Sequence, residues 1–429
     1  MTGTLTIHQP GKESPYRAFS EADNESHGQL WTPIIKGENL TVSVSIPNDK
    51  KHQLDLHLAS INHGFRPWKS NKIGGDVSGL CNIDAVCRSG DPLIDTPLGS
   101  VIDFYDAQIR SVAAYTISGT DTCSGALINN TANDKRGFFL TADHCQISSA
   151  NAAAVVFYFN FMNSSCRARG NAQSSAVGDG SLAQFMSGSN FRATNAASDF
   201  CLVELDDPIP ASYNVFFSGW DRSSSAPTLT VGVHHPAVAE KRISVDLDSL
   251  QSAGDFWRVV DWDFGTTEGG SSGSPLFNSN GNIVGQLQGG SAACGNNLND
   301  FYGKVATSWT GGGTSATRLS NWLDPINSNT TSHGGIDHSN TLTIEDESIV
   351  EGDSGSSTME FTIRLSRADT QNVTVQYQTA TSTAVSGSDF TSTTGTATFL
   401  PGATTFTVNV PITGDTSSEG DEAFLVNLS

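Results

Sequence analysis

Three short segments carry side chains that together could perform acyl-transfer chemistry. LTADHC contains His144, SDFCLVEL places Asp199 before an apolar stretch, and EGGSSGSPLF holds Ser272 in a glycine-rich loop. Acyl transfer needs a nucleophile, a base that takes its proton, and an acid that orients the base. It also needs two amides aimed at the developing oxyanion, and glycines allow the amides of Gly270 and Ser272 to point the same way. The segments therefore predict a His144–Asp199–Ser272 triad.

The chain order of these residues separates two kinds of hydrolase. An α/β-hydrolase has the pattern Gly-x-Ser-x-Gly and the order Ser–Asp–His. Here the residue two after Ser272 is Ser274, and the order is His–Asp–Ser. A second class stays open, namely a binding or adhesion protein that keeps a protease fold without catalysis. The complete set of triad positions argues against it.

The patterns T-A-x-H-C and G-x-S-G-S-P, in this order, resemble those of the trypsin-like (chymotrypsin-fold) serine proteases. Longer stretches are similar to the secreted bacterial lysyl endopeptidases, namely CNIDAVC, INNTANDKRGFFLTADHC, VHHPAVAEKRIS, GSSGSP and FYGKVATSWTGGG, within residues 75–327. The resemblance implies a secreted endopeptidase that cleaves protein and peptide substrates after lysine. In it, His144 is general base and acid, Asp199 orients the imidazole, and Ser272 attacks. Broader Lys/Arg cleavage is the alternative.

Specificity for a basic residue requires a carboxylate in the primary pocket. Trypsin carries its aspartate six residues before the nucleophile, where this chain has Thr266. By resemblance to the lysyl endopeptidases, Asp300 before Phe-Tyr-Gly takes this role, with Gln288 and Gly289 also lining the substrate site. Gln288 replaces a histidine of the best-known members. The alternative for Asp300 is a solvated loop acid.

Seven cysteines mark one domain, because none precedes position 81 or follows position 294. No CxxC pair occurs, so a zinc site is not expected and no metal ligand is assigned. Three disulfides and one free thiol indicate an oxidising compartment, and spacing alone leaves 105 pairings open. The resemblance implies the pairs Cys81–Cys294, Cys87–Cys166 and Cys123–Cys145. Cys201 is then a buried apolar side chain.

Lysine is distributed unevenly, with six residues up to Lys72 and only three after it, at positions 135, 241 and 304. An enzyme that cleaves after lysine benefits from few lysines in its mature chain. We therefore expect self-processing at Lys72, which removes residues 1–72 as a pro-region that serves as inhibitor or chaperone. The residue before the nucleophile is Ser271, where trypsin has an aspartate that pairs with the new N-terminal amine. That ion pair is not available here, so removal of the pro-region is expected to unblock the cleft or to follow assisted folding.

The sequence predicts that short strands position these residues. Alternation or continuous apolar runs predict strands at 111–117, 138–142, 154–161, 200–205, 229–233 and 283–287, with a hairpin at Asn280-Gly281. Helical periodicity is expected only at 315–323. We therefore predict an all-β chain: a β-rich pro-region at 1–72, a chymotrypsin-like double β-barrel with a C-terminal helix at 73–327, a linker at 328–340, and a β-sandwich at 341–429.

The last segment resembles a Calx-β domain through IVEGDSG, TAVSGSDFTSTTGTATFLPG and ITGDTSSEGDEAFLVNLS. The chain ends within an expected strand, so this domain is expected to be truncated. Some members of that family bind Ca²⁺ through clustered carboxylates, and Asp415, Glu419 and Asp421 offer part of such a site. A structural or surface-anchoring spacer is the favoured interpretation, and no cofactor is otherwise expected.

Charge excludes several classes of partner. The net charge of −21 repels phosphate backbones and anionic lipid, so nucleic-acid and membrane-surface roles are not expected. No apolar run is long enough to span a bilayer, and the first residues lack the apolar region of a signal peptide. His234 and His235 are adjacent on a strand and point to opposite faces, which favours a structural or pocket-edge role over a metal site.

Overall fold

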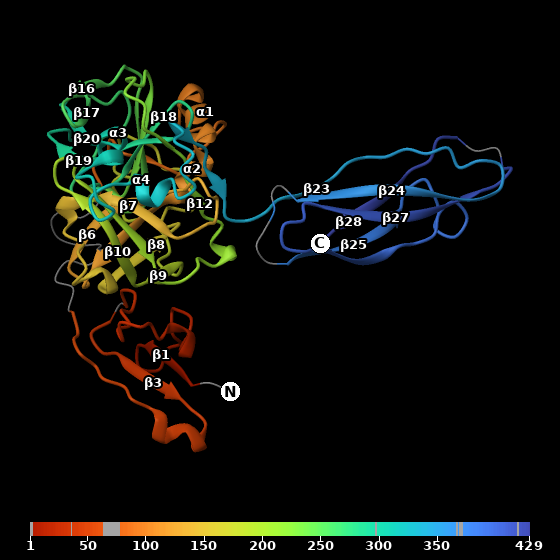
Figure 1. Cartoon of the computed structure of the whole chain (residues 1–429), viewed down its shortest axis with the longest axis horizontal. Coiled ribbons are helices and arrows are strands. Elements are labelled where there is room, and N and C mark those ends of the chain that lie inside the picture. Colours follow the sequence, from red (N-terminus) through yellow and green to blue (C-terminus); the bar gives the residue numbers. More distant parts are fainter. Residues whose placement is uncertain are drawn as a thin grey trace. The chain divides into compact units, whose positions relative to one another are not determined.

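The structure is a computed structural model that describes residues 3–35, 37–62, 78–296, 298–365, 368, 372–417 and 420–429. The chain forms two compact units, Met1–His338 and Ser339–Ser429, each with its own core. Figure 1 shows both as β structures with few helices. None of the helices in the described residues has the length and apolar character needed to cross a bilayer.

The first barrel of the larger unit is an antiparallel sheet in the order β10-β11-β7-β6-β5-β8-β9. Its strands are β5 (Val112–Ile117), β6 (Asp121–Leu127), β7 (Phe138–Ala142), β8 (Val155–Phe159), β9 (Phe185–Ser187), β10 (Ser189–Asn195) and β11 (Phe200–Leu205). In β11, Phe200 and Leu202 join the core shared with the second sheet, whereas Cys201, Val203 and Leu205 fill this barrel. Both faces of residues 200–203 are buried, which explains why this part of the strand is a continuous apolar run.

The second barrel follows the order β16-β17-β20-β19-β18-β14-β15-β4. Its strands are β4 (Ile83–Asp84), β14 (Thr230–His234), β15 (Arg242–Asp246), β16 (Gln251–Ala253), β17 (Phe256–Val259), β18 (Pro275–Asn278), β19 (Ile283–Gly290) and β20 (Asp300–Lys304). The expected turn at Asn280-Gly281 joins β18 to β19, and Gly281 takes a left-handed φ of +73° that favours glycine. The all-β, chymotrypsin-like double barrel is confirmed.

The expected linker contains short strands that pair with this unit. β21 (Ser332–His333) pairs with β13 (Trp220–Asp221), and β22 (Ile336–Asp337) pairs with β12 (Phe216–Phe217). The final helix is shorter than expected: α4 covers Ser320–Leu323, after α3 (Val305–Thr310). Residues 315–319 form a turn instead, because the Thr317 carbonyl accepts the Gly312 amide at 3.1 Å and closes a loop there.

Sequence reasoning missed two helices, α1 (Thr96–Phe104) and α2 (Asp106–Ser111). Leu98, Ile102, Tyr105 and Ile109 are buried in the core between the sheets. Their spacing of three to four residues is the signal of an amphipathic helix, and the proline at position 97 suits a first helical turn.

The N-terminal segment of the described chain packs on the first barrel. It contains β1 (Thr4–His8), β2 (Phe19–Ser20) and β3 (Thr41–Ser45), which form a three-stranded sheet. Phe19 is 3 % exposed and joins a core cluster with Tyr158 and Phe185. Residues of β8 and β9 thus receive the segment on their outer face.

The second unit is a β-sandwich of two three-stranded sheets in the described residues, ordered β23-β24-β27 and β26-β25-β28. Its strands are β23 (Leu342–Ile344), β24 (Gly355–Leu365), β25 (Val373–Thr381), β26 (Thr394–Phe399), β27 (Thr405–Gly414) and β28 (Phe424–Leu428). Apolar side chains of both sheets, including Phe361, Val375 and Val410, meet in one core.

Candidate active site

The ends of two neighbouring strands bring His144 and Asp199 together. β7 ends at Ala142 and continues into a 3-10 turn, Asp143–Cys145, while β11 begins directly after Asp199. Phe200 pairs with Ala142, and the Asp143 amide donates to the Asp199 carbonyl at 2.9 Å. Asp199 takes a left-handed φ of +54°, which aspartate tolerates better than most residues.

The carboxylate of Asp199 holds His144 through both of its oxygens. Oδ1 accepts the His144 backbone amide at 2.9 Å, and Oδ2 lies 2.7 Å from Nδ1 of the ring. This hydrogen bond raises the pKa of His144, and burial opposes the shift. The Asp199 side chain is 7 % exposed and that of His144 41 %, so the acid is enclosed while the ring stays accessible. This geometry directs Nε2 away from the acid, as a general base requires.

The second barrel supports this pair from behind. Gln286 Nε2 donates to the Ser198 carbonyl at 2.8 Å, and the Ser308 hydroxyl donates to the Ser198 hydroxyl at 2.9 Å. A side chain at Gly303 would lie 1.8 Å from the same carbonyl, so only glycine fits there. Sequence reasoning did not find these supports, because their partners lie far along the chain.

Ser272 lies in the oxyanion loop, residues 268–274, which is fastened to the first barrel by Ser124. The Ser124 hydroxyl donates to the Gly270 carbonyl at 2.8 Å, and its amide donates to the Ser272 carbonyl at 2.9 Å. A side chain at Gly273 would lie 2.1 Å from Thr141 Oγ1, so the loop closely approaches the end of β7. Ser272 is thereby brought to the strand end that carries His144.

The amides of Gly270 and Ser272 have no hydrogen-bond acceptor among the described residues. Gly270 has a φ of +92°, a conformation that glycine adopts without strain. Both amides are therefore available to an oxyanion. Within the same residues, Ser272 Oγ forms no hydrogen bond to His144, a contact that often tightens only when substrate binds.

Asp300, the first residue of β20, is a buried carboxylate with one occupied oxygen. Trp262 Nε1 and Thr267 Oγ1 donate to Oδ2 at 2.8 and 2.7 Å. Oδ1 forms no hydrogen bond of regular geometry in the described part of the chain, although the Ala292 backbone also acts to lower the pKa of the carboxyl. Asp300 is 0 % exposed, so it is not a solvated loop acid. Burial raises its pKa, and the Trp262 and Thr267 donors oppose that shift.

The neighbouring strand β19 carries the other two expected pocket residues. Gln288 is the extra residue of a β-bulge between Leu287 and Gly289, and it is exposed. Gly289 has a φ of +138° and open space where a side chain would be. A side chain at Gly290 would lie 2.3 Å from Asp300 Oδ1, so glycine keeps that oxygen clear.

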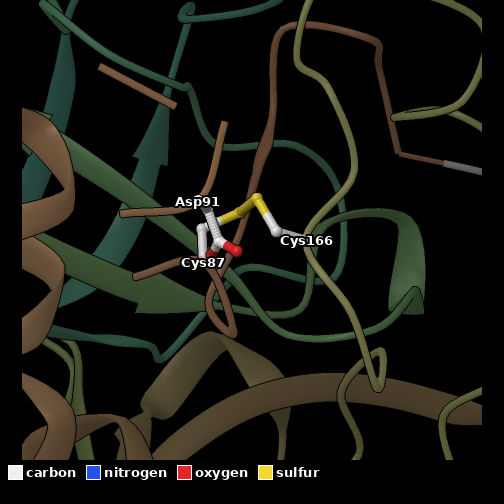
Figure 2. Close-up of side chains that lie close together, drawn as sticks. All are labelled: Cys87, Asp91 and Cys166. Atoms are coloured by element: carbon white, nitrogen blue, oxygen red, sulfur yellow. A yellow bond between two sulfur atoms is a disulfide. The ribbon is translucent and has the colours of Figure 1, made fainter. Parts of the chain in front are cut away.

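The structure contains the disulfides Cys81–Cys294, Cys87–Cys166 and Cys123–Cys145, and Cys201 is free and buried. Figure 2 shows Cys87 and Cys166 joined by their sulfurs beside Asp91. These atoms are close enough to hold an ion, but disulfide sulfurs are not thiolate ligands. The Cys123–Cys145 bridge fastens the residue after His144 to β6.

The remaining expected residues lie elsewhere. Lys72 and Glu419 fall outside the described residues. Asp415 and Asp421 are exposed, and Asp415 accepts the Ser417 amide at 2.6 Å.

Comparisons with known proteins found a matching family model for each unit. A family model described as the C-terminal domain of lysyl endopeptidase matches residues 75–303, and one for the Calx-beta domain matches residues 336–429. A lysyl endopeptidase of Pseudomonas aeruginosa is 29 % identical over 321 residues, which cover 70 % of this chain and 65 % of that protein. The chain therefore spans just under two thirds of the length of this relative.

Three solved structures are also similar. The apo form of the Calx CBD1 domain is 29 % identical with a TM-score of 0.16, covering 17 % of this chain and 64 % of its own. Deg5 is 14 % identical with a TM-score of 0.32, covering 50 % and 92 %. A Nocardiopsis protease is 18 % identical with a TM-score of 0.27, covering 46 % and 92 %. Since the first family model covers more than half of the 429 residues, the chain belongs to the family of the lysyl endopeptidase C-terminal domain, and it carries a Calx-beta domain after it.

Proposed function

We propose that the protein is a secreted serine endopeptidase that hydrolyses peptide bonds on the C-terminal side of lysine and is made as a self-processing precursor. The observation that carries the proposal is the hydrogen-bonded His144–Asp199 pair at the strand end approached by the loop of Ser272. Family membership and the lysyl endopeptidase relative support the same reaction. Three disulfides support an oxidising, extracellular setting.

The proposed reaction follows from these positions. Ser272 Oγ attacks the carbonyl carbon of the scissile bond while His144 Nε2 takes its proton, and the carbonyl electrons move to the oxygen. The amides of Gly270 and Ser272 donate to that oxyanion, and Asp199 stabilises the protonated imidazole. Collapse breaks the C–N bond, and His144 gives its proton to the leaving amine. Water then repeats the sequence and releases Ser272.

The preference for lysine rests on Asp300. Oδ1 has no partner among the described residues, so it is the oxygen that can accept an ammonium group. A lysine ammonium is a compact charge with three donors, whereas an arginine guanidinium is a planar fork that needs two acceptor atoms in register. Because Trp262 and Thr267 occupy Oδ2, a single free oxygen favours the ammonium.

Two measurements test the proposal. First, a diphenyl phosphonate with a lysine side chain should label the wild-type chain and not the Ser272→Ala variant. Second, every new terminus made in a denatured protein of known sequence should follow lysine. Cuts after arginine as well would retain the triad and replace lysine specificity by the broader alternative. Absence of both labelling and cleavage would assign the chain to the silent binding or adhesion class.

Self-processing is proposed at Lys72, which lies outside the described residues. The burial of two of the three later lysines supports it: Lys241 is 0 % exposed and Lys304 is 9 % exposed, whereas Lys135 is half-buried. Lys304 is held by Ser252 Oγ and the Gly254 carbonyl at 2.6 and 2.7 Å. Lys72→Gln should prevent release of residues 1–72, as read by mass spectrometry, while Lys69→Gln should not.

For the Calx-beta domain we propose a spacer or surface-anchoring role. Its acids Asp415 and Asp421 have exposed side chains, which supports solvation rather than ion binding. Calorimetric titration of the full chain with Ca²⁺ should give no binding at micromolar concentration. Binding heat that disappears in Asp415→Asn would overturn this role.

A further inference from the structure

Ser271 lies between the two amides that the proposed oxyanion hole uses. Its neighbours Gly270 and Ser272 are both in the oxyanion loop, so a shift of Ser271 displaces both donors. Ser271 is 0 % exposed, and its amide donates to the Glu268 carbonyl at 2.9 Å. Trypsin-like enzymes with an aspartate at this position fix it by an ion pair with a new N-terminus, which serine cannot form. Another group must therefore hold this residue.

A buried chain of hydrogen bonds reaches Ser271 from the second barrel. His234, the last residue of β14, lies with Nδ1 2.8 Å from Ser271 Oγ and with Nε2 3.0 Å from Ser244 Oγ. The Ser244 hydroxyl donates to the Thr266 carbonyl at 2.9 Å. The Glu268 amide donates to Ser271 Oγ at 3.2 Å. His234, Ser244 and Ser271 are each 0 % exposed, so water does not compete.

Only one arrangement of protons gives every donor in this series of hydrogen bonds an acceptor. The Ser244 hydroxyl gives its proton to the Thr266 carbonyl, so Ser244 Oγ accepts from Nε2–H of His234. Nδ1 then carries no proton and accepts from the Ser271 hydroxyl, whose oxygen accepts the Glu268 amide. In the opposite tautomer, Ser271 Oγ would face two donors, and its own proton would have no acceptor in the chain.

The surroundings of His234 keep it neutral. Burial lowers its pKa to about 3, and the nearby Arg242 guanidinium acts in the same direction. A neutral ring presents one donor and one acceptor, as this series of hydrogen bonds requires. The side chain of the adjacent His235 takes no part: its Nδ1 contacts the Ala239 carbonyl at 3.0 Å, and its ring stacks on Phe161. Its backbone amide donates to Ser124 Oγ at 3.0 Å, a bond that a side-chain substitution retains.

We propose that His234 is a positioning residue that fixes the oxyanion loop through Ser271, in place of an ion pair with a new N-terminus. The inference rests on the proposed serine mechanism, because it concerns the loop that would hold the oxyanion. It explains how the loop reaches its shape while residues 3–62 are still attached. His234, for which sequence reasoning favoured a structural or pocket-edge role, thereby acquires a role in the reaction.

Two conservative variants, His234→Asn and His234→Gln, test separately the hydrogen bonds of His234 to Ser271 and to Ser244. The Oδ1 atom of Asn takes about the place of His Nδ1 and can accept from Ser271, whereas the Nε2 atom of Gln takes about the place of His Nε2 and can donate to Ser244. His235→Asn is the matched control, because His235 is equally buried and keeps its donor to Ala239 as asparagine. Each variant is processed in trans by affinity-tagged wild-type enzyme, which is then removed.

The readouts are kcat and KM for a lysyl anilide, the inhibition constant of a lysyl peptide aldehyde, and the thermal midpoint. His234→Gln should lower kcat by roughly 10²-fold with KM within threefold, the size of effect seen when one oxyanion donor is lost. Its aldehyde affinity should fall in parallel, while His234→Asn should retain kcat within tenfold. Equal kcat in His234→Gln and wild type, or an equal loss in His235→Asn at a matched thermal midpoint, would overturn the role. Lack of activity in the wild type would instead refute the proposed function.

Discussion

At the scale of single residues, the protonation state of His144 sets the activity that we expect. The imidazole must be neutral to take the Ser272 proton, so kcat should fall as pH decreases through its pKa. Since Asp199 raises that pKa, Asp199→Asn should move the acidic limb to lower pH and lower the plateau by roughly 10⁴-fold. The measurement is kcat at saturating lysyl substrate from pH 4 to 9.

A neighbouring acid provides the control for this pH profile. Asp143 also favours the protonated ring, but only by its charge and less than Asp199 does. Asp143→Asn should therefore shift the limb less and preserve most of the plateau. A limb that stays in place in Asp199→Asn would contradict the assigned base.

The second prediction at this scale concerns Asp300. Asp300→Asn keeps the shape of the side chain but removes its charge, so a bound lysine ammonium would be buried without a counter-ion. Loss of one partner of such a pair costs about 2–5 kcal/mol, so kcat/KM for lysyl substrates should fall by roughly 30-fold or more. Activity on a norleucine substrate should not fall. Asp263→Asn, which removes an exposed acid close to Trp262, is the matched control, and an equal loss in it would contradict the assignment.

At the scale of elements, a buried lysine links β15 and α2. Lys241 is directly before β15, and its Nζ donates to the Ile109 carbonyl in α2 at 2.8 Å. Burial lowers its pKa to about 7 from the usual 10.5. The unfolded chain thus binds more protons between these values, so wild-type stability should rise as pH increases from 7 to 10.5. Below pH 7, both states are protonated and the destabilisation is complete.

Lys241→Met should therefore stabilise the protein most at low pH. The Ile109 carbonyl keeps its bond from the Val112 amide, so the change leaves no unpaired backbone group. We expect a gain of about 1–4 kcal/mol in the free energy of unfolding at pH 6, which diminishes towards pH 10. Urea unfolding at both pH values with intact disulfides measures it. A loss of stability at pH 6 would show that the ammonium contributes favourably.

Sequence reasoning predicted the elements that local pattern specifies and missed those that tertiary contact specifies. The continuous apolar run of β11 and the glycine turn before β19 are local signals, and both elements form as expected. The order of His144, Asp199 and Ser272 likewise indicated the reaction class. By contrast, Trp262 and Thr267 become visible only when the fold brings them to Asp300, more than thirty residues away in sequence.

At the scale of the whole molecule, the N-terminal segment packs against the first barrel. Phe19 packs against Phe185 with ring centroids 6.0 Å apart, the Ile34 amide donates to Tyr158 at 3.1 Å, and His27 pairs with Asp206 at 2.9 Å. These contacts lie on β8, β9 and the end of β11, outside the triad. For the described part of the segment, these contacts favour a role in assembling the first barrel over direct blocking of the cleft.

Phe19→Asp tests this role, because it puts a charge into the apolar contact with β8 and β9. The yield of soluble chain that a lysine phosphonate labels should fall several-fold, since a buried charge without a partner prevents docking. Any mature enzyme obtained should have wild-type kcat, because residues 1–72 are then absent. Leu58→Asp, at a side chain that is 67 % exposed in the same segment, should leave the yield unchanged. An unchanged yield in Phe19→Asp, with a more active uncleaved precursor, would instead identify the segment as an inhibitor.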